Sequence, residues 1–276
     1  MAESVDDAGD FAGGESAQDK QTAAPPRNAF TELMAPKTKP PKPDAGKSSR
    51  SATGKGGKWT GALVEYIEHP ERFPREVLRV TPNTVLIKDL YPKATIHLLL
   101  LPRDPARYLM NPREAFDDGT FLSVVRDEAV SAARIAAAEL SRQLSSFSAS
   151  SQAQNEAIDA GVLAAELPPG RDFLSEMRIG VHAHPSMDHL HVHIFSPDMH
   201  SDKVKHYKHY NSFNTPFFIP LDDFPLAADD ERRSTAFQNA NLKRDFVCWR
   251  CGKVFGNKFA ELKRHLEIEF ELWKKT

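Results

Sequence analysis

The segment from Arg178 to Met199 reads RIGVHAHPSMDHLHVHIFSPDM and carries the most informative pattern of the chain. Near its centre, three histidines alternate with aliphatic residues. Alternation with a period of two is typical of a β-strand, whose successive side chains point to opposite faces. The aliphatic face can join a hydrophobic core, whereas three imidazoles on the other face have no packing role. We therefore predict a strand over 189–195 that presents His189, His191 and His193 to a reaction centre.

Further histidines flank this predicted strand. Eight of the eleven histidines of the chain fall between His182 and His209. A single histidine is more often a core or surface residue than a functional one, and histidine-rich strands also occur as metal sites or polar faces. The pattern H-φ-H-φ-H-φ-φ is much narrower, and it is the signature of the histidine-triad nucleotide hydrolases and transferases. We favour the catalytic interpretation.

Composition bounds the class of protein. The chain has 276 residues, a formal net charge of -2 and a pI of about 6.6, so one or two folded domains fit and the whole chain is not a basic nucleic-acid binder. We see no signal peptide and no apolar run long enough to span a bilayer. The two cysteines form a single C-x-x-C pair, which indicates a reducing compartment and a metal or redox role. We expect a soluble, intracellular protein with no membrane partner.

The N-terminal region differs from the rest in composition. Residues 1–56 are rich in Ala, Gly, Ser, Pro and Lys, and we predict a disordered tail. Within it, apolar residues at helical spacing in 27–34 could dock on a protein partner, although a chance cluster explains them equally well. Spaced basic residues over 37–58 suit nuclear import or loose attraction to phosphates, and we expect a nuclear protein.

Hydrophobic periodicity predicts an α+β fold, an antiparallel sheet with helices, over a catalytic domain at 57–220. Order should begin near Trp59, in a helix that ends at Pro70. We predict strands at 77–80, 84–87, 96–102, 176–183, 189–195 and 217–219, and a long helix at about 112–143. Residues 145–170 are rich in Ser, Ala and Gln, and we expect an inserted mobile loop there. Residues 221–276 should form a second, smaller domain.

The C-terminal domain contains a zinc-finger pattern. Cys248 and Cys251 are followed after thirteen residues by His265 and, after three more, by Glu269. On a helix predicted over 257–273, the last two are four positions apart and share a face. This spacing supplies four tetrahedral ligands, and a carboxylate can replace the usual second histidine. We predict a structural Zn²⁺ site, with a redox role for the cysteines as the weaker alternative.

A histidine triad followed by a Cys-Cys-His-Glu finger resembles the aprataxin family of DNA 5′-adenylate hydrolases, particularly its fungal members. The matching motifs are VLIKD at 85–89, YPKA at 91–94, HLLLLP at 97–102, HAHPSM at 182–187 and KHYNSFNT at 208–215. The similarity extends over about 58–276. The phosphopeptide-binding domain of animal members has no counterpart in 1–56, and the 145–170 segment is unusual.

The resemblance implies a reaction in which AMP is removed from a DNA 5′ end left by abortive ligation. His191 would attack the AMP phosphorus and form an adenylyl-histidine intermediate, which water then hydrolyses. His189 and His193 would bind the phosphate oxygens, and His182 would assist the departure of the DNA phosphate. No metal is needed for this step, so the zinc would serve structure and DNA contact.

The same resemblance assigns binding residues. Those for the nucleotide and its phosphates are Asp89, Lys93, Ser186 and Met187. Those for DNA are Trp59, Lys208, His209 and Tyr210, to which the basic finger surface adds Lys253 and Lys258. Trp59 would stack on the terminal base pair, with core packing as its alternative, and some of the lysines could simply be solvated. The implied partners are adenylated DNA ends, nicked or double-stranded, with RNA–DNA junctions also possible, and AMP is the product.

Rival functions remain open at this point. The first is a general histidine-triad hydrolase that acts on AMP-lysine or dinucleoside polyphosphates. The second is a zinc-finger DNA-binding protein with an inactive triad domain, although an intact triad argues against it. The third is processing of RNA caps or diphosphoguanosine ends by the same chemistry. We expect a monomer, because a finger and a stacking residue around one DNA end leave little need for a second subunit.

Overall fold

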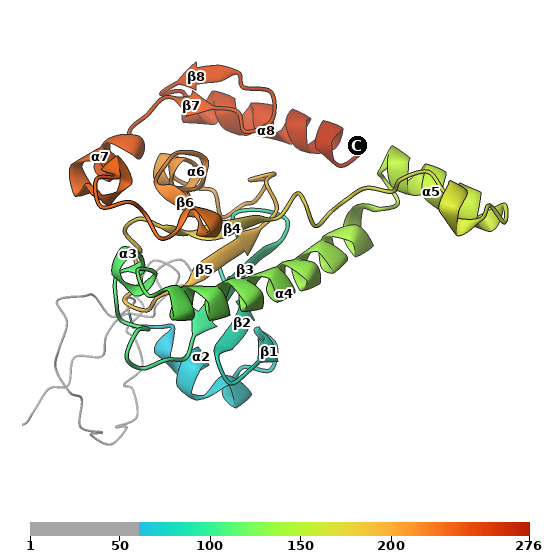
Figure 1. Ribbon diagram of the computed structural model, residues 1–276. Coiled ribbons are helices and arrows are strands. Elements are labelled where there is room, and N and C mark those ends of the chain that lie inside the picture. Colours follow the sequence, from blue (N-terminus) through green and yellow to red (C-terminus); the bar gives the residue numbers. More distant parts are fainter. Residues whose placement is uncertain (1–60) are drawn as a thin grey trace, which may run out of the picture. The chain divides into compact units, whose positions relative to one another are not determined.

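A computed structural model describes residues 61–276 of the chain (Figure 1), which belong to one compact unit. The predicted tail at 1–56, its docking segment at 27–34 and Trp59 lie outside the described residues and stay predictions. Among the described residues, no helix has the length and apolar character that crossing a membrane requires.

Six strands form one sheet in the order β1-β2-β3-β5-β4-β6, and every neighbouring pair is antiparallel. The strands are β1 (Val77–Val80), β2 (Thr84–Lys88), β3 (His97–Pro102), β4 (Arg178–His182), β5 (Val192–Phe195) and β6 (Phe218–Pro220). The predicted antiparallel α+β sheet is confirmed. Its central pair, β3 and β5, joins segments that are far apart in the sequence, and this pairing positions the histidines.

The helices are α2 (Val64–Glu68), α3 (Pro112–Ala115), α4 (Gly119–Leu144), α5 (Ala149–Asp159), α6 (Tyr207–Asn214), α7 (Thr235–Asn241) and α8 (Phe259–Trp273). The single helix predicted over 112–143 is divided into α3 and α4. Two N-caps explain the break: the Asn111 side chain accepts from the amide of Arg113, and that of Asp118 accepts from the amides of Thr120 and Phe121. A cap residue has non-helical backbone angles, so the second cap begins a new helix.

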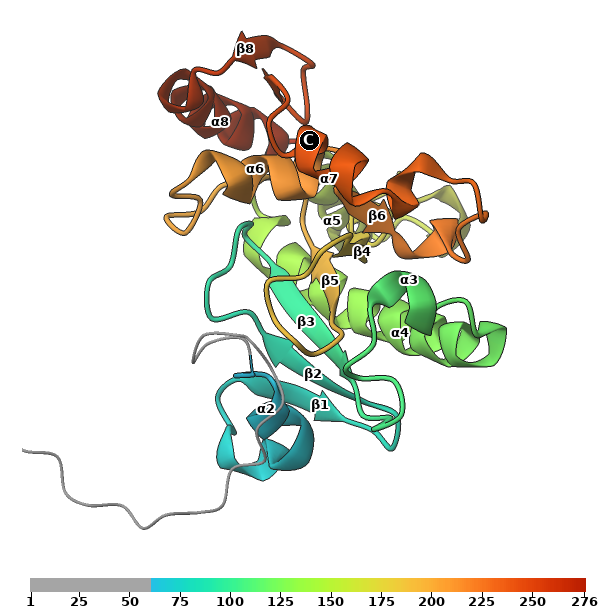
Figure 2. The same cartoon turned by 90° about the vertical axis from the view of Figure 1, so that its left-hand side faces the viewer.

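The sheet separates two apolar layers, and alternate residues of each strand join different layers. Leu98 and Leu100 of β3 and Ile194 of β5 pack with the alanine-rich face of α4, whereas Leu99 and Leu101 of β3 pack with α2. Figure 2 shows these two helices on either side of the sheet. His193 therefore lies on the face opposite α4, as the period of two predicts.

The 145–170 segment is not a loop throughout, which corrects the prediction. It contains α5, whose N-cap Ser148 accepts from the amide of Ser151, and a short 3₁₀ turn at Ala164–Glu166. Ser151 is the only buried residue of α5, so the helix has no apolar stripe and its sequence does not show the helical period. The helix projects from the body of the molecule (Figure 1).

The finger consists of a short hairpin, β7 (Phe246–Val247) and β8 (Val254–Gly256), followed by α8. It does not fold around a core of its own. Phe246 and Leu262 of the finger pack with Phe195 and Phe213 of the catalytic region in one buried cluster. The sheet and the finger are therefore held together by shared apolar burial.

Candidate functional site

The three triad histidines lie together at the start of β5. His193 is in the strand, opposite Leu99 of β3 and Gly180 of β4, and the other two precede it. The strand begins at Val192 and is shorter than predicted, and the His189 carbonyl, which lies before it, accepts from the His191 ring. All three side chains are nearly inaccessible, with exposed fractions of 6%, 5% and 5%. The three histidines thus share one buried region, although only His193 lies within the strand.

His191 has one free ring nitrogen. Its Nδ1 lies 2.8 Å from the carbonyl oxygen of His189, which can only accept, so Nδ1 carries the hydrogen and Nε2 keeps its lone pair. Burial lowers the pKa of His191, and the hydrogen bond to the His189 carbonyl only partly opposes this effect. The ring is therefore neutral near neutral pH, which is the form that a nucleophile requires.

His97 at the start of β3 sets the tautomer of His193. The amide of Lys93 donates to Nδ1 of His97 at 3.1 Å, so the hydrogen of His97 is on Nε2. That nitrogen lies 3.0 Å from Nδ1 of His193 and donates to it. His193 then carries its own hydrogen on Nε2, a buried donor that has no partner among the described residues. The backbone amide of Lys93 thus fixes the tautomer of His97 and, through it, that of His193, which leaves Nε2 of His193 as a hydrogen-bond donor.

The charge state of His97 results from two opposed effects. Burial lowers its pKa to about 4, although the carboxylate of Asp89, 3.4 Å from Nδ1, acts in the opposite direction. Burial is the larger effect, so His97 is neutral and Nδ1 is free to accept from Lys93. Asp89, His97 and His193 also lie close enough together to hold a metal ion, but both nitrogens of His97 are already hydrogen-bonded.

His182 completes the cluster from the end of β4. Its ring centroid is 4.4 Å from that of His193, and burial places its pKa well below the ordinary value. The buried atoms without a partner include Nε2 of His182 and Nδ1 of His189. Such groups are rare in folded proteins, because a buried polar atom without a hydrogen bond is costly. A bound phosphate would supply the missing oxygens.

The predicted nucleotide residues surround this cluster. Asp89 follows β2 and accepts from the amide of Tyr91, and Lys93 is partly buried, which lowers its pKa. Ser186 is exposed in the connection between β4 and β5, and Met187 packs against the α2 cluster. The structure thus brings Asp89 and Lys93 to His97, while Ser186 and Met187 lie on the loop that leads to the triad.

The predicted DNA residues differ in exposure. Lys208 on α6 and Lys253 and Lys258 in the finger are exposed, and His209 is half-buried. Tyr210 corrects the prediction, because its side chain is 0% exposed and is not available to DNA. Its hydroxyl donates to the carbonyl of Val247 at 2.8 Å and accepts from the amide of Trp249 at 3.0 Å. Tyr210 of α6 therefore binds the backbone of the finger on both sides of the first cysteine, Cys248.

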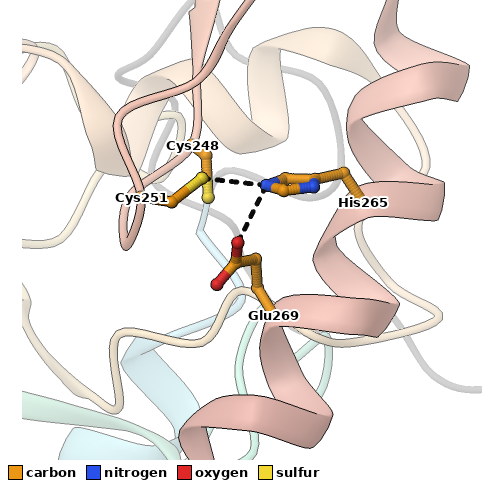
Figure 3. A group of neighbouring side chains, drawn as sticks. All are labelled: Cys248, Cys251, His265 and Glu269. Carbon is orange, nitrogen blue, oxygen red and sulfur yellow. Dashed lines mark hydrogen bonds and ion pairs between the residues drawn. The ribbon is translucent and has the colours of Figure 1, made fainter.

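The four predicted zinc ligands come together in the finger (Figure 3). Their ligand atoms all lie within 4.8 Å of one another, and Nε2 of His265 is 3.1 Å from both Sγ of Cys251 and Oε1 of Glu269. Ligands around a tetrahedral zinc ion are separated by about 3.3–3.8 Å, which is close to these two distances. Gly252 has φ of 73° and allows the tight turn after the second cysteine. The residues fit a structural Zn²⁺ ion.

Three residues near these clusters were not predicted. His97 is the first residue of the buried, apolar strand β3, and a polar residue in such a strand could have indicated a functional role. The Tyr108 ring packs against His189 in a tilted arrangement, with centroids 5.2 Å apart, and the Tyr108 carbonyl accepts from the amide of Leu190. Arg250 donates to Glu269. No sequence pattern marks the last two, because their partners are far away in the chain.

Two protein families match parts of the chain. The C2HE / C2H2 / C2HC zinc-binding fingers match residues 214–272, which include all four zinc ligands. The family described as scavenger mRNA decapping enzyme C-terminal binding matches residues 163–209, which include the triad.

Curated relatives match most of the chain. The aprataxin-like protein of Saccharomyces cerevisiae is 33% identical over 217 residues, which are 77% of this chain and 96% of the relative. That of Schizosaccharomyces pombe is 31% identical over 224 residues, 76% of this chain and 81% of the relative. Alignments that span three quarters of the chain must include the triad at 189–193, wherever they begin.

Solved structures show the same similarity. The aprataxin ortholog Hnt3 from Schizosaccharomyces pombe is 30% identical with a TM-score of 0.58, over 78% of this chain and 95% of that chain. A structure of Hnt3 in complex with DNA and guanosine is 30% identical with a TM-score of 0.60, over 78% and 97%. Fold and sequence thus agree over the same share of the molecule.

Proposed function

This chain belongs to the aprataxin family, and we propose that it is a DNA-repair hydrolase that removes AMP from 5′-adenylated DNA ends. One observation carries the proposal: a neutral imidazole with a free Nε2, His191, lies beside buried donors that have no partner. A phosphate ester fits this arrangement, since it offers an electrophilic phosphorus and several acceptor oxygens. Hnt3, the similar structure, was solved in complex with DNA.

In the first step, Nε2 of His191 attacks the AMP phosphorus and forms a P–N bond. The P–O bond to the DNA phosphate breaks, and the DNA 5′-phosphate leaves with the electron pair. The positive charge that develops on the ring is stabilised by the hydrogen bond from Nδ1 to the His189 carbonyl. In the second step, water attacks the same phosphorus and loses a proton to the solvent, the P–N bond breaks with its electron pair returning to Nε2, and AMP leaves with neutral His191 restored.

The neighbouring groups stabilise the negative charge on the phosphoryl oxygens. His193 donates from Nε2, in the direction set by its hydrogen bond from His97. Donors that are fixed before the reaction lower the barrier, because they do not have to reorganise as charge develops. His189 and exposed Ser186 supply further donors, and His182 interacts with the departing DNA phosphate through its unpartnered Nε2.

The nucleoside and the DNA lie on either side of this centre in the proposal. Asp89 accepts from the ribose hydroxyls and Lys93 attracts the nucleotide phosphate. Exposed Lys208, Lys253 and Lys258 attract the DNA backbone. Zn²⁺, when bound, supplies structure to the finger and no chemistry. We further propose that the protein acts as a monomer in the nucleus, where the basic residues of 37–58 support import.

The test compares two substrates. We expect AMP release from a 5′-adenylated nicked duplex by the wild-type chain, and much slower release from AMP-lysine. His191→Ala should abolish both, whereas His69→Ala should abolish neither, because His69 is 41% exposed and has Glu71 as its partner. Faster release from AMP-lysine than from the nick would establish a general nucleotide hydrolase instead. Normal release by His191→Ala would refute the nucleophile.

A second activity, release of GMP from guanosine-capped ends, is favoured by two observations. The decapping-enzyme family matches the triad segment, and Hnt3 was solved with guanosine. The chemistry is the same, with a different base in the nucleoside pocket. A DNA end joined to GMP through a pyrophosphate provides the test. GMP release that His191→Ala abolishes would support this activity, and intact capped DNA after complete deadenylation of a matched end would exclude it.

A further inference from the structure

Arg250 lies between the two cysteines of the finger, and its Nη1 donates to Oε2 of Glu269 at 2.9 Å. We propose that Arg250 is a positioning residue of the zinc site. It holds Glu269 as a ligand through one oxygen, and it balances the negative charge that a carboxylate brings to the site. Arg250 thereby makes a Cys-Cys-His-Glu set suitable for zinc where a second histidine is more usual.

The two carboxylate oxygens of Glu269 have different partners. Oε1 lies 3.1 Å from Nε2 of His265 and faces the other ligands, whereas Oε2 accepts from Arg250. The Glu269 side chain is only 6% exposed, so neither oxygen can turn toward water. Binding zinc through both oxygens would require Oε2 to leave the guanidinium. The ion pair therefore selects ligation through Oε1 alone.

Charge gives the second argument. Two thiolates and one carboxylate carry three negative charges, and Zn²⁺ carries two positive charges, so the loaded site has a net charge of -1. A site with two cysteines and two histidines is neutral. Cys248 and Glu269 are 2% and 5% exposed, and an unbalanced charge in such surroundings is costly. The positive charge of the Arg250 guanidinium restores neutrality.

Arg250 is distinguished from the other basic residues of the finger by its contact. Among the described residues, it is the only lysine or arginine paired with a zinc ligand, while Lys258 pairs with Glu261 and Lys274 with Glu271. Exposed ion pairs contribute little, but this one has a buried acceptor. Groups that hydrogen-bond to metal ligands typically change metal affinity or activity by about 10–100-fold.

A double-mutant cycle on the full chain tests the proposal through zinc affinity, measured by competition with a chromophoric chelator. We expect Arg250→Gln to weaken zinc binding by about 10–100-fold. In a Glu269→His background the same substitution should cost nothing, because a neutral imidazole leaves no charge for Arg250 to balance. Arg264→Gln is the matched control, since Arg264 is an exposed arginine of α8 for which the structure shows no ion pair. It should leave affinity unchanged.

Equal losses in both backgrounds would show that Arg250 supports the finger in general and would overturn the proposal, as would no loss in either. If Glu269→His does not fold, cobalt(II) substitution of the wild type and Arg250→Gln decides. We expect the intense tetrahedral absorption of the wild type to weaken in Arg250→Gln, as Glu269 becomes free to bind through both oxygens. An unchanged spectrum with unchanged affinity would refute the role. Because neither readout uses AMP release, the result is independent of the proposed reaction.

Discussion

The two histidine clusters of this protein differ in how their polar atoms are paired. At the triad, buried nitrogens of His182 and His193 have no partner among the described residues. In the finger, His265 contacts both Cys251 and Glu269. Buried donors without partners suit a ligand that enters and leaves, whereas donor atoms that converge on one point suit an ion that stays. The same side chain therefore serves turnover in one cluster and structure in the other.

Charge separates the clusters as well. Burial lowers the pKa of each triad histidine, so the three imidazoles are uncharged before an anionic phosphate arrives. In the finger cluster, two cysteines, a histidine and a carboxylate would hold a cation, with Arg250 beside them. Each cluster thus avoids an isolated buried charge by a different route. The predictions below test this contrast.

The largest effect is expected from removal of the nucleophile. His191→Ala should reduce AMP release by on the order of 10⁶-fold, the loss that follows removal of an activated nucleophile. Zinc content per chain should not change, because His191 has no contact with the finger ligands. Single-turnover kinetics and zinc analysis of the same sample measure both. Loss of zinc in this variant would mean that the two clusters are not independent.

Removal of zinc should affect structure first. Cys251→Ser deletes one ligand, and structural zinc contributes about 10–16 kcal/mol of apparent binding free energy in finger peptides. We expect a large drop in Tm, because the finger shares its core with Phe195 and Phe213. Release of AMP from DNA should fall more than release from AMP-lysine. Calorimetry and the two rates measure this, and an unchanged Tm would contradict a structural metal.

The hydrogen bond from His97 to His193 should matter for rate and not for zinc. His97→Leu removes the donor to Nδ1 of His193 and frees the His193 tautomer, so we expect kcat to fall by about 10–100-fold. His97→Gln keeps an amide donor near the same place and should recover part of the loss. If Leu and Gln at this position give equal kcat values, the tautomer argument is wrong.

Stability should depend on pH through the same histidine. The pKa of His97 is about 4 in the folded chain against an ordinary value of 6.5, so between these values the unfolded state binds more protons. The stability that neutral, buried His97 contributes is complete above pH 6.5. It is lost as the pH falls toward 4, by up to about 1.4 kcal/mol per pH unit. Urea unfolding at several pH values should show that the free energy of unfolding depends less steeply on pH in His97→Gln than in the wild type. The same dependence on pH in both proteins would indicate that His97 is not buried in its neutral form.

The smallest effect is expected at the far end of the finger helix from the zinc ligands. Nε1 of Trp273 donates to Oε2 of Glu176 at 2.7 Å, and Glu176 also pairs with Arg171. Trp273→Phe should cost about 1–3 kcal/mol in the free energy of unfolding, because the partly buried carboxylate of Glu176 loses a donor. Zinc affinity should stay the same. A change in zinc affinity would show that the two ends of α8 are coupled.

Local patterns explain what could be predicted. The alternation around His191 is a strand period that continues into β5, and the separation of His265 from Glu269 is one helical turn, so each pattern lies within one short segment of the chain. The motif HLLLLP likewise marks β3 as buried. The α5 helix escaped prediction because a helix that buries almost nothing has no apolar period.

By itself, the sequence determined the triad, the four zinc ligands and the antiparallel α+β class, since the spacing of residues along single segments of the chain encodes them. Only the tertiary structure decided that His97 donates to His193, that Tyr210 is buried under the finger, and that Arg250 pairs with Glu269. Such pairs join residues far apart in the chain. Their contacts arise from strand order and from the packing of the finger on the sheet, which no local period contains.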